Sequence, residues 1–185
     1  MKKLRSDIER YNGMLGYLGP VSTPKLLMAC FNPRIVPVVV LRFSEYFYEH
    51  RCGVLAKLFS ALNILAFGIE VSPRVQIGGG LFLPHTVGTV IGAASIGINC
   101  TIMQGVTLGT SEPDMSFNIS ERPVIGNNVL IGAGAKIIGH VTVGDHAKIG
   151  ANAVVLRDVP AYALAVGVPA MVVPRKAPDN SESAT

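Results

Sequence analysis

One histidine and one glutamate have the residue types and the spacing that acid–base chemistry needs. His85 carries an imidazole, which in its neutral form is the usual base at pH 7 for a hydroxyl group that loses its proton as it attacks. Glu70 lies 15 residues earlier, and a carboxylate on the far ring nitrogen fixes the tautomer of such a histidine. We therefore predict that His85 is a general base and that Glu70 orients it, provided that the fold brings the two together.

A repeat of six residues runs through the second half of the chain and must position these side chains. Large aliphatic residues recur at this interval, and a second apolar residue, often small, stands two positions before each one. The large set is Ile125, Ile131, Ile137, Val143, Ile149 and Val155, and the second set is Val129, Ala135, Val141, Ala147 and Ala153. Upstream, the same rule holds for Val90, Ile96, Ile102 and Leu108, for Ala94, Cys100 and Val106, and for Val71, Ile77 and Leu83.

This period predicts a three-sided β-helix. Neither the 3.6-residue period of a helix nor the two-residue period of a strand fits, whereas six residues supply one short strand and one turn. Three such sides complete a coil, so residues 18 apart stack at the spacing of neighbouring strands, about 4.8 Å. His85 lies where the register slips by one between Leu83 and Val90, and loops of this kind often carry function. Because Glu70 precedes His85 by a little less than one coil, the two can meet across neighbouring coils.

The hexads divide the chain into regions. Residues 1–68 lack them and are predicted to be a helical region that caps the first coil. Helices are expected there over 6–17, 33–50 and 54–67. Residues 69–176 form the predicted β-helix domain, in which 110–122 break the register and are expected to protrude as a functional loop. The polar residues 177–185 are predicted to be a disordered tail.

Composition and charge limit the function classes. The chain is 49% hydrophobic with a net charge of +4, and nine basic against four acidic side chains precede residue 69. The apolar stretches are interrupted before they reach the roughly 18–20 residues of a membrane span, and no signal-peptide stretch follows the first lysines, which favours a cytoplasmic protein. The scattered basic residues are interpreted as a solvated face, although they also allow peripheral membrane contact. Cys30, Cys52 and Cys100 have no paired spacing and are expected to be buried thiols.

Residues 69–176 resemble the serine acetyltransferase branch of the hexapeptide-repeat acyltransferases. The resemblance rests on G-I-E-V-S-P (68–73), I-G-G-G-L-F-L-P-H (77–85), Q-G-V-T-L-G (104–109), I-G-A-G-A-K-I-I-G (131–139) and D-V-P-A-Y-A-L-A-V-G-V-P-A (158–170). It implies a left-handed parallel β-helix, a homotrimer with active sites between adjacent subunits, and an enzyme that uses acetyl-CoA as co-substrate to acetylate a hydroxyl group. His85 and Glu70 match the histidine of the family and its acidic partner, which is an aspartate there.

The resemblance also implies where acetyl-CoA binds. Its pantetheine arm is expected to lie against backbone groups of successive coils in the groove between two subunits, where only small side chains allow close approach. Ala133 and Ala151 are 18 apart, hence predicted to stack, and match family positions that touch the cofactor. Lys148, Arg157 and Arg175 are available for its phosphates, since a fixed cation gives an anion a charge-assisted hydrogen bond.

Two departures from the family pattern concern the acceptor. Where serine acetyltransferases have an aspartate before the histidine this chain has Pro84, and the long loop ends in Glu121, Arg122 and Pro123 instead of arginine, histidine and proline. Both missing groups are associated in the family with holding the amino acid. We therefore expect a sugar of capsular or exopolysaccharide biosynthesis as acceptor, as in the polysaccharide O-acetyltransferases of this family, with serine of cysteine biosynthesis as the alternative.

The loop over 110–122 has a predicted role by the same resemblance. It is expected to leave the β-helix and cover the active site of a neighbouring subunit, where Arg122 and Asp114 contact the acceptor. A flap without specific contacts is the alternative.

Other function classes have weaker support. A γ-class carbonic anhydrase shares this fold but needs three histidines around a metal. His140 and His146 fall at turn positions shared with Asn128 and Asn152, so we interpret them as turn residues and expect no metal. A non-catalytic trimeric scaffold is the alternative of a different class. Nucleic-acid binding is not expected, because the chain lacks a basic patch interleaved with aromatic residues.

Overall fold

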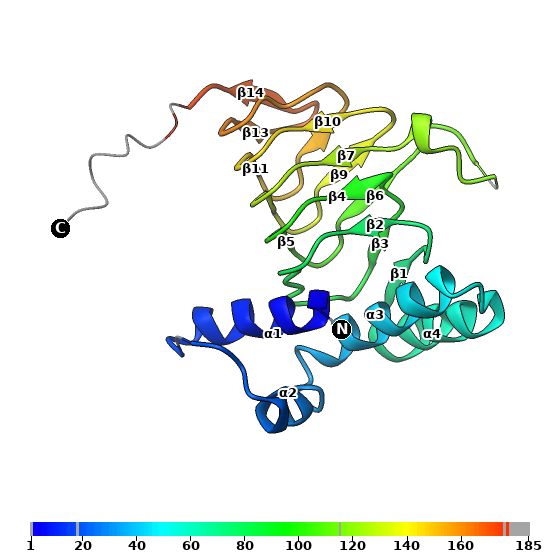
Figure 1. Ribbon diagram of the computed structural model, residues 1–185. Helices are drawn as coiled ribbons and strands as arrows, with labels where there is room; N and C mark the ends of the chain where they lie inside the picture. The colour runs from blue at the N-terminus through cyan, green and yellow to red at the C-terminus, as the bar shows by residue number, and fades with distance from the viewer. Residues whose placement is uncertain (1, 18, 115, 176, 178–185) are drawn as a thin grey trace.

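The computed structural model describes residues 2–17, 19–114, 116–175 and 177. In this part of the chain four α-helices come first and a stack of short strands follows (Figure 1). The helices are α1 (Lys2–Met14), α2 (Thr23–Ala29), α3 (Val36–Glu49) and α4 (Gly53–Phe67). The tail predicted over 177–185 lies, apart from Ala177, outside the described residues.

The strands form three sheets, which are the three sides of a prism. The first sheet holds β1 (Ile69–Val71), β3 (Thr89–Ile91), β6 (Thr107–Gly109), β9 (Lys136–Ile138) and β12 (Val154–Val155). The second holds β2 (Gln76–Ile77), β4 (Ser95–Ile96), β7 (Val124–Ile125) and β10 (Thr142–Val143). The third holds β5 (Thr101–Ile102), β8 (Leu130–Ile131), β11 (Lys148–Ile149), β13 (Leu164–Val166) and β14 (Met171–Val173).

Successive strands of the chain pass from one sheet to the next, and each pairs in parallel with a strand one coil away. The exception among the described strands is β14, which turns back antiparallel to β13 and ends the stack. Figure 1 shows the helices at the opposite end, below the first coil. This architecture confirms the predicted left-handed parallel β-helix of hexapeptide repeats with α-helices before it.

Most coils are close to 18 residues long. Lys136 pairs with Val154, and Leu130 pairs with Lys148, each 18 residues later. One coil is longer, because Thr107 pairs with Lys136, 29 residues later. The additional residues lie in the loop between β6 and β7, which contains the short 3-10 helix η1 (Ile119–Glu121) and extends away from the prism in Figure 1.

The two apolar positions of each hexad fill the inside of the prism. From Ile125 to Val155 every residue of both predicted series is at most 2% exposed. Burial of a large aliphatic side chain stabilises a fold by about 1.5–3 kcal/mol, so the repeat itself supplies most of the driving force. Upstream, Val90 and Ala94 were predicted to point inward but are half-buried. The buried residues there are their neighbours Ile91 and Ala93, so the predicted register is wrong by one residue at these two positions. The turn after Leu83 is one residue longer than expected, and the following side of the coil is one residue shorter.

Three of the four helices lie where the sequence predicts helices, over 6–17, 33–50 and 54–67. The fourth, α2, is not predicted; it has only seven residues, with Pro24 in its first turn, where proline is tolerated. The expectation of buried thiols holds for Cys100 alone, because Cys30 is half-buried and Cys52 is exposed.

Buried ionic contacts attach the helices to the first coil. Arg42 of α3 donates two hydrogen bonds to the carboxylate of Asp7 in α1, at 2.8 and 3.0 Å, and one to Glu45 at 2.8 Å. It also donates to the carbonyl oxygens of Ile77 and Gly78, at 3.0 and 2.6 Å. Because β2 is at the edge of its sheet, these carbonyls have no strand below them, and Arg42 takes the place of the missing strand.

The same contacts make Arg42 an exception to the interpretation of the basic first third as a solvated face, in which most of the other basic side chains are exposed. Asp7 is 2% exposed and Arg42 7% exposed, so both charges are inside the protein. Burial alone would lower the pKa of Arg42, but hydrogen bonds and charge from Asp7 and Glu45 outweigh it and raise the pKa. Arg10 of α1 acts in a similar way and donates to Cys100 O at 2.6 Å and to Gly80 O.

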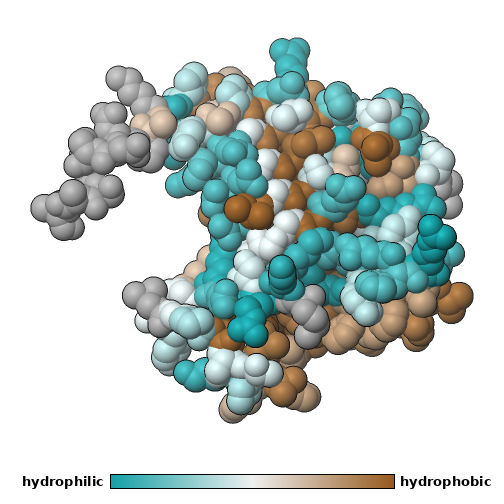
Figure 2. All heavy atoms as spheres, viewed as in Figure 1, coloured by the Kyte–Doolittle hydropathy of each residue, from teal (hydrophilic) through white to brown (hydrophobic). Residues whose placement is uncertain are grey.

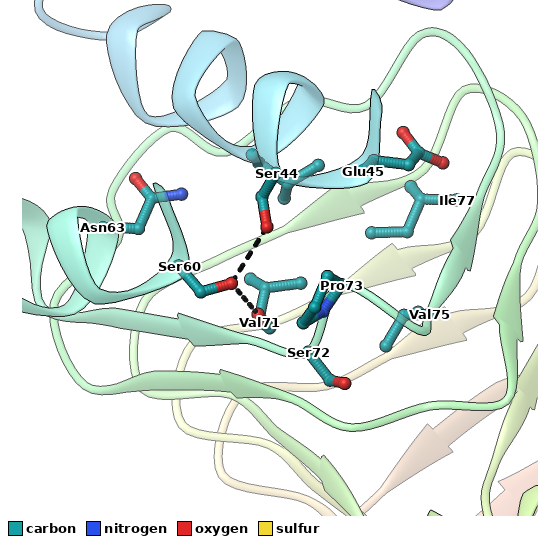
Figure 3. A pocket seen from close by; sticks show the side chains of 10 residues that line it. Ser44, Glu45, Ser60, Asn63, Val71, Ser72, Pro73, Val75 and Ile77 are labelled. Atoms are coloured by element: carbon teal, nitrogen blue, oxygen red, sulfur yellow. Dashed lines mark hydrogen bonds between the residues drawn. The ribbon is translucent and has the colours of Figure 1, made fainter. Parts of the chain in front are cut away.

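A small cavity remains between α3, α4 and the first coil (Figure 3). Ser60 joins its walls, since its hydroxyl lies 3.0 Å from Ser44 Oγ and donates to Val71 O at 3.1 Å. The cavity volume is about 10 Å³, which is room for one water molecule and too small for a substrate.

Candidate active site

His85 lies on an irregular turn at the first-coil end of the prism, on the outside. The buried side chain of Leu83 fixes the turn on one side, and β3 continues it on the other. Two hydrogen bonds attach the turn to the end of α4: Thr86 Oγ1 donates to Phe67 O at 2.7 Å, and Gly88 N donates to Gly68 O at 2.9 Å. His85 itself is exposed, so its imidazole is accessible to a molecule that binds against this edge.

Glu70 is in the strand that follows α4. Its neighbours Ile69 and Val71 point into the prism, and strand alternation therefore turns Glu70 outward, where it is exposed. The structure places the segments of Glu70 and His85 side by side, because β1 pairs with β3 and the His85 turn is bonded to Phe67 and Gly68. Among the described residues no hydrogen bond joins the two side chains.

A column of stacked backbone positions begins beside His85 and runs along one edge of the prism. Gly105 N donates to Val87 O at 3.1 Å, Gly134 N to Gln104 O at 2.8 Å, and Asn152 N to Ala133 O at 2.8 Å. Val87, Gln104, Ala133 and Ala151 therefore succeed one another from coil to coil. The predicted stacking of Ala133 on Ala151 agrees with the 18-residue register of β8 and β11.

Three of the four residues next in sequence along this edge are glycines without side chains, and the fourth is Asn152, whose side chain lies beside Gly134. Gly88, Gly105 and Gly134 have φ values of +73°, +70° and +73°, in the left-handed region that glycine adopts without cost. A Cβ on Gly105 would lie 3.5 Å from Gly134 Cα, and one on Gly134 would collide with the side chain of Asn152. A narrow ligand can therefore approach the backbone closely along the column that leads away from His85.

The three basic residues predicted to hold phosphates lie further along the prism and are exposed. Lys148 is in β11, one coil beyond Leu130 and three residues before Ala151. Arg157 follows β12 and lines a cleft of about 610 Å³ next to β14, at the end of the prism opposite the helices. Arg175 follows β14. The structure does not gather the three at one point.

Arg122 and Asp114, predicted to contact the acceptor, are joined to one another inside the long loop. Arg122 Nη2 donates to Asp114 Oδ2 at 2.9 Å, and Arg122 Nη1 donates to Gly92 O at 2.9 Å. The ring of Phe117 covers the guanidinium with its centroid 3.9 Å from Cζ. Arg122 is 7% exposed, so in this conformation it organises the loop; its predicted contact with an acceptor stays a prediction.

Asp114 organises the other half of the loop. Its carboxylate accepts hydrogen bonds from Ser116 N at 2.8 Å, Ser116 Oγ at 2.6 Å and Asn118 N at 2.6 Å. Hydrogen bonding from Ser116, and then from Arg122, holds the pKa of Asp114 well below its usual range against the opposing effect of burial. Arg74 ties the loop to the first coil by donating to Ser116 O at 2.8 Å.

Two polar residues near His85 are absent from the predicted site. Thr86 fixes the turn through Phe67 O, and its position next to the histidine is the only signal in the sequence. Gln104 stands in the column beside His85, and its Oε1 is buried without a hydrogen-bond partner among the described residues. Its place in the Q-G-V-T-L-G motif could have drawn attention to it.

The interpretation as a turn residue like Asn128 and Asn152 is confirmed for His146 and wrong for His140. His146 has a φ of +60°, as Asn128 and Asn152 do with +55° and +57°. His140 is not among the positive-φ residues; Gly139, with φ +87°, takes that turn position instead.

Comparison with known proteins agrees with the architecture. Residues 122–157 match the bacterial transferase hexapeptide (six repeats) family. The serine acetyltransferase of Helicobacter pylori strain 26695 is 40% identical over 149 residues, which cover 80% of this chain and 85% of that protein. The serine acetyltransferase of Synechococcus elongatus is 39% identical over 150 residues, and the match spans 60% of its length.

Solved structures give the same relationship. A serine acetyltransferase of Neisseria gonorrhoeae in complex with serine has a TM-score of 0.77 at 30% identity, with 94% of this chain and 68% of that chain covered. A serine acetyltransferase in complex with CoA has a TM-score of 0.76 at 34% identity, with 93% and 68% covered.

These matches correct the predicted branch. The expectation of a polysaccharide O-acetyltransferase is wrong, because relatives that match most of this chain, helices included, are serine acetyltransferases. The departures at Pro84 and at Glu121, Arg122 and Pro123 are therefore variations within that branch. The chain belongs to the serine acetyltransferase family of hexapeptide-repeat transferases.

Proposed function

We propose that this chain is a serine O-acetyltransferase, which transfers the acetyl group of acetyl-CoA to the hydroxyl oxygen of serine. The observation that carries the proposal is the relationship to serine acetyltransferases over most of the chain. It is joined by an exposed His85 at the start of a column of stacked backbone positions that is flanked mostly by glycines. Related serine acetyltransferases have been solved in complex with CoA and in complex with serine.

In the proposed reaction His85 is the general base. Its neutral imidazole takes the proton of the serine hydroxyl while the oxygen forms a bond to the carbonyl carbon of the thioester. The carbon–sulfur bond then breaks, and the imidazolium returns the proton to the leaving sulfur, so that O-acetylserine and CoA are formed and His85 is regenerated. No covalent acyl-enzyme is needed, because the acceptor attacks the thioester directly.

Glu70 is proposed as a positioning residue for His85. Its carboxylate is exposed on the adjacent strand, and hydrogen bonding to the far ring nitrogen would stabilise the imidazolium that forms during transfer. Both side chains are exposed, and catalytic hydrogen bonds are often completed only when the substrate is bound.

The column beyond His85 is proposed to hold the pantetheine arm of acetyl-CoA. Ala133 and Ala151 follow one another along it and leave backbone groups accessible. Three exposed cations further along the prism are the proposed ligands of the phosphates: Lys148, Arg157 and Arg175.

A single chain supplies only one wall of this site. His85, Glu70 and the column all lie on the outside of the prism, whereas a small-molecule site normally buries most of its ligand. We therefore propose that the protein is a homotrimer, in which an adjacent copy closes the groove. The long loop, with Asp114 and Arg122 at its base, is then the segment that reaches the acceptor in a neighbouring site.

The test is release of the free CoA thiol from acetyl-CoA by purified full-length protein. L-Serine should accelerate release, whereas D-serine, L-threonine and free sugars should leave it near the rate of hydrolysis. The control variant His140→Ala, which changes an exposed histidine on a different turn, should retain the wild-type rate. Acceleration by a sugar and none by L-serine would overturn the proposal.

A further inference from the structure

Helix α4 has an apolar face that no described residue covers. Val54, Leu58 and Leu65 lie on one side of the helix and are 83%, 62% and 86% exposed. The opposite side packs on α3, where Phe59 stacks on Phe43 and Phe47. A helix that is apolar all round is normally buried, so the outer face of α4 predicts a further contact.

Helix α2 carries a second group of exposed apolar residues at the same end of the molecule. Leu27 and Met28 are 60% and 75% exposed, and Phe31, just after the helix, is 83% exposed. Figure 1 shows α2 and α4 at the same end of the molecule, below the first coil, and Figure 2 shows hydrophobic atoms over both along that edge. We call these six residues on α2 and α4 the basal apolar surface.

The charge around the basal apolar surface is positive. Four basic side chains are exposed on these two helices or in the connections next to them: Lys25 on α2, Lys57 on α4, Arg34 before α3 and Arg51 before α4. From residue 11 to residue 69 the acidic residues are Glu45 and Glu49. Glu45 is buried against Arg42, and Glu49 lies 3.9 Å from the ammonium group of Lys3.

We propose that the basal apolar surface binds the headgroup region of an anionic lipid bilayer. An amphipathic element with large apolar side chains and a basic rim lies in the plane of such an interface, with the apolar residues below the headgroups and the cations among the phosphates. Long basic side chains suit this arrangement, because their stems contact apolar surface while their charges remain in water. No described helix is long and apolar enough to span a bilayer, so the contact is peripheral.

Charge distinguishes this partner from a second copy of the protein. Two basal apolar surfaces placed face to face would bring the same basic rims together without acidic residues to pair them, whereas anionic lipids neutralise each rim. Figure 1 shows α2 and α4 at one end of the stack of coils, so copies assembled side by side with parallel prisms would present this end on the same side.

The proposal places the active site close to the bilayer and does not depend on the acceptor. The end of α4 accepts the hydrogen bond of Thr86 at Phe67 O, and Thr86 is adjacent to His85. Membrane contact through α4 therefore brings the candidate active site within about one coil of the headgroups.

Flotation of the purified full-length protein with lipid vesicles tests this inference. Vesicles of phosphatidylcholine with roughly 30% phosphatidylglycerol should carry the protein, and pure phosphatidylcholine should bind it at least about tenfold more weakly, since each basic residue near an anionic surface contributes to binding. Raising the salt from about 0.1 M to about 0.5 M should weaken binding, because screening shortens the reach of the lipid charge.

The double variant Leu58→Ser/Leu65→Ser should lower the partition coefficient about 100-fold, about tenfold for each leucine. The matched control is Ile98→Ser/Leu156→Ser, which removes two side chains that are 50% and 55% exposed away from α2 and α4. This control should bind vesicles as the wild type does.

Three results would overturn the proposal. The wild type could fail to float with anionic vesicles, or Leu58→Ser/Leu65→Ser could bind as well as the wild type. The double variant could also change the assembly mass measured by light scattering, which would identify the surface as a contact between subunits. Vesicle binding that is lost at unchanged assembly mass supports the membrane contact.

Discussion

Replacing Arg42 with methionine removes five hydrogen bonds at once from the junction between the helices and the β-helix. Two go to Asp7, one to Glu45, and two to the edge carbonyls of Ile77 and Gly78. Loss of one partner of a buried ion pair costs about 3–5 kcal/mol, because the other charge is left without compensation. Methionine fills much of the same volume, so the loss measures the polar contacts more than a cavity.

The structure also predicts where this free energy is lost. A solenoid is held by contacts between neighbouring coils, so damage at one end stays near that end. In Arg42→Met the amides of α1, and that of Leu81, which donates to Asp7 at 2.8 Å, should exchange about 150- to 5,000-fold faster, as a loss of about 3–5 kcal/mol implies. The amides of β8 and β11, two or more coils away, should exchange at the wild-type rate.

Native-state hydrogen exchange with mass spectrometry measures both regions in one sample. Lys57→Met is the matched control, because it exchanges an exposed cation for methionine on the neighbouring helix and should change stability by less than about 0.5 kcal/mol. Wild-type protection of α1 in Arg42→Met would refute the idea that this guanidinium replaces a strand below the first coil. Uniform loss of protection over the whole prism would refute the nearest-neighbour reasoning.

Three further predictions concern the site, the core and the loop. His85→Ala should lower the rate of acetyl transfer about 10²- to 10⁴-fold, the usual effect of a general base; steady-state kinetics that match the wild type would exclude His85 as the base. Ile131→Ala should lower the free energy of unfolding, measured in urea, by about 2–5 kcal/mol. Leu130 is adjacent but 42% exposed, so Leu130→Ala should lower it far less. Equal losses would contradict the assignment of Ile131 to the inward face. Since the pKa of Asp114 is lowered in the folded loop, its carboxylate stabilises the loop above the ordinary pKa of about 4, and the contribution is lost as the pH falls from there towards the lowered value. Asp114→Asn should therefore speed hydrogen exchange over 110–122 at pH 7, with a difference from the wild type that shrinks below about pH 4; a difference that is constant with pH would contradict this.

The repeat made the core predictable to the residue over most of the prism. Each hexad from Ile125 to Val155 offers one register that buries both apolar positions, and no other periodicity competes with it. The prediction was wrong at Val90, because the turn around His85 has an unusual length and neighbouring residues are all apolar or small. Val90 and Ile91 are adjacent and both aliphatic, so hydrophobicity alone cannot decide which of the two points into the core.

The junction with the helices was not predictable from composition. Arg42 interrupts an apolar stretch of α3, and it was interpreted with the other scattered basic residues as part of a solvated face and not as a buried partner of Asp7, 35 residues away. Two of the groups that Arg42 binds are backbone carbonyls at the edge of a sheet. Every residue has a carbonyl, so the sequence does not show which ones need a side-chain donor. The candidate site was located through the His85 motif, whereas the acceptor was assigned wrongly from two substitutions. In the proposed trimer an adjacent subunit would complete the pocket at both positions, and the shape of such a pocket cannot be read from the sequence of a single chain.

The long loop adds its residues to one coil without disturbing any other. Ser95 aligns with Val124, Thr101 with Leu130 and Thr107 with Lys136, so all three sides of the prism absorb the same 29-residue step. The buried aliphatics below and above the loop remain in register, and the hydrophobic core does not sense its length. During evolution the length and sequence of this segment can therefore change while the rest of the β-helix stays the same.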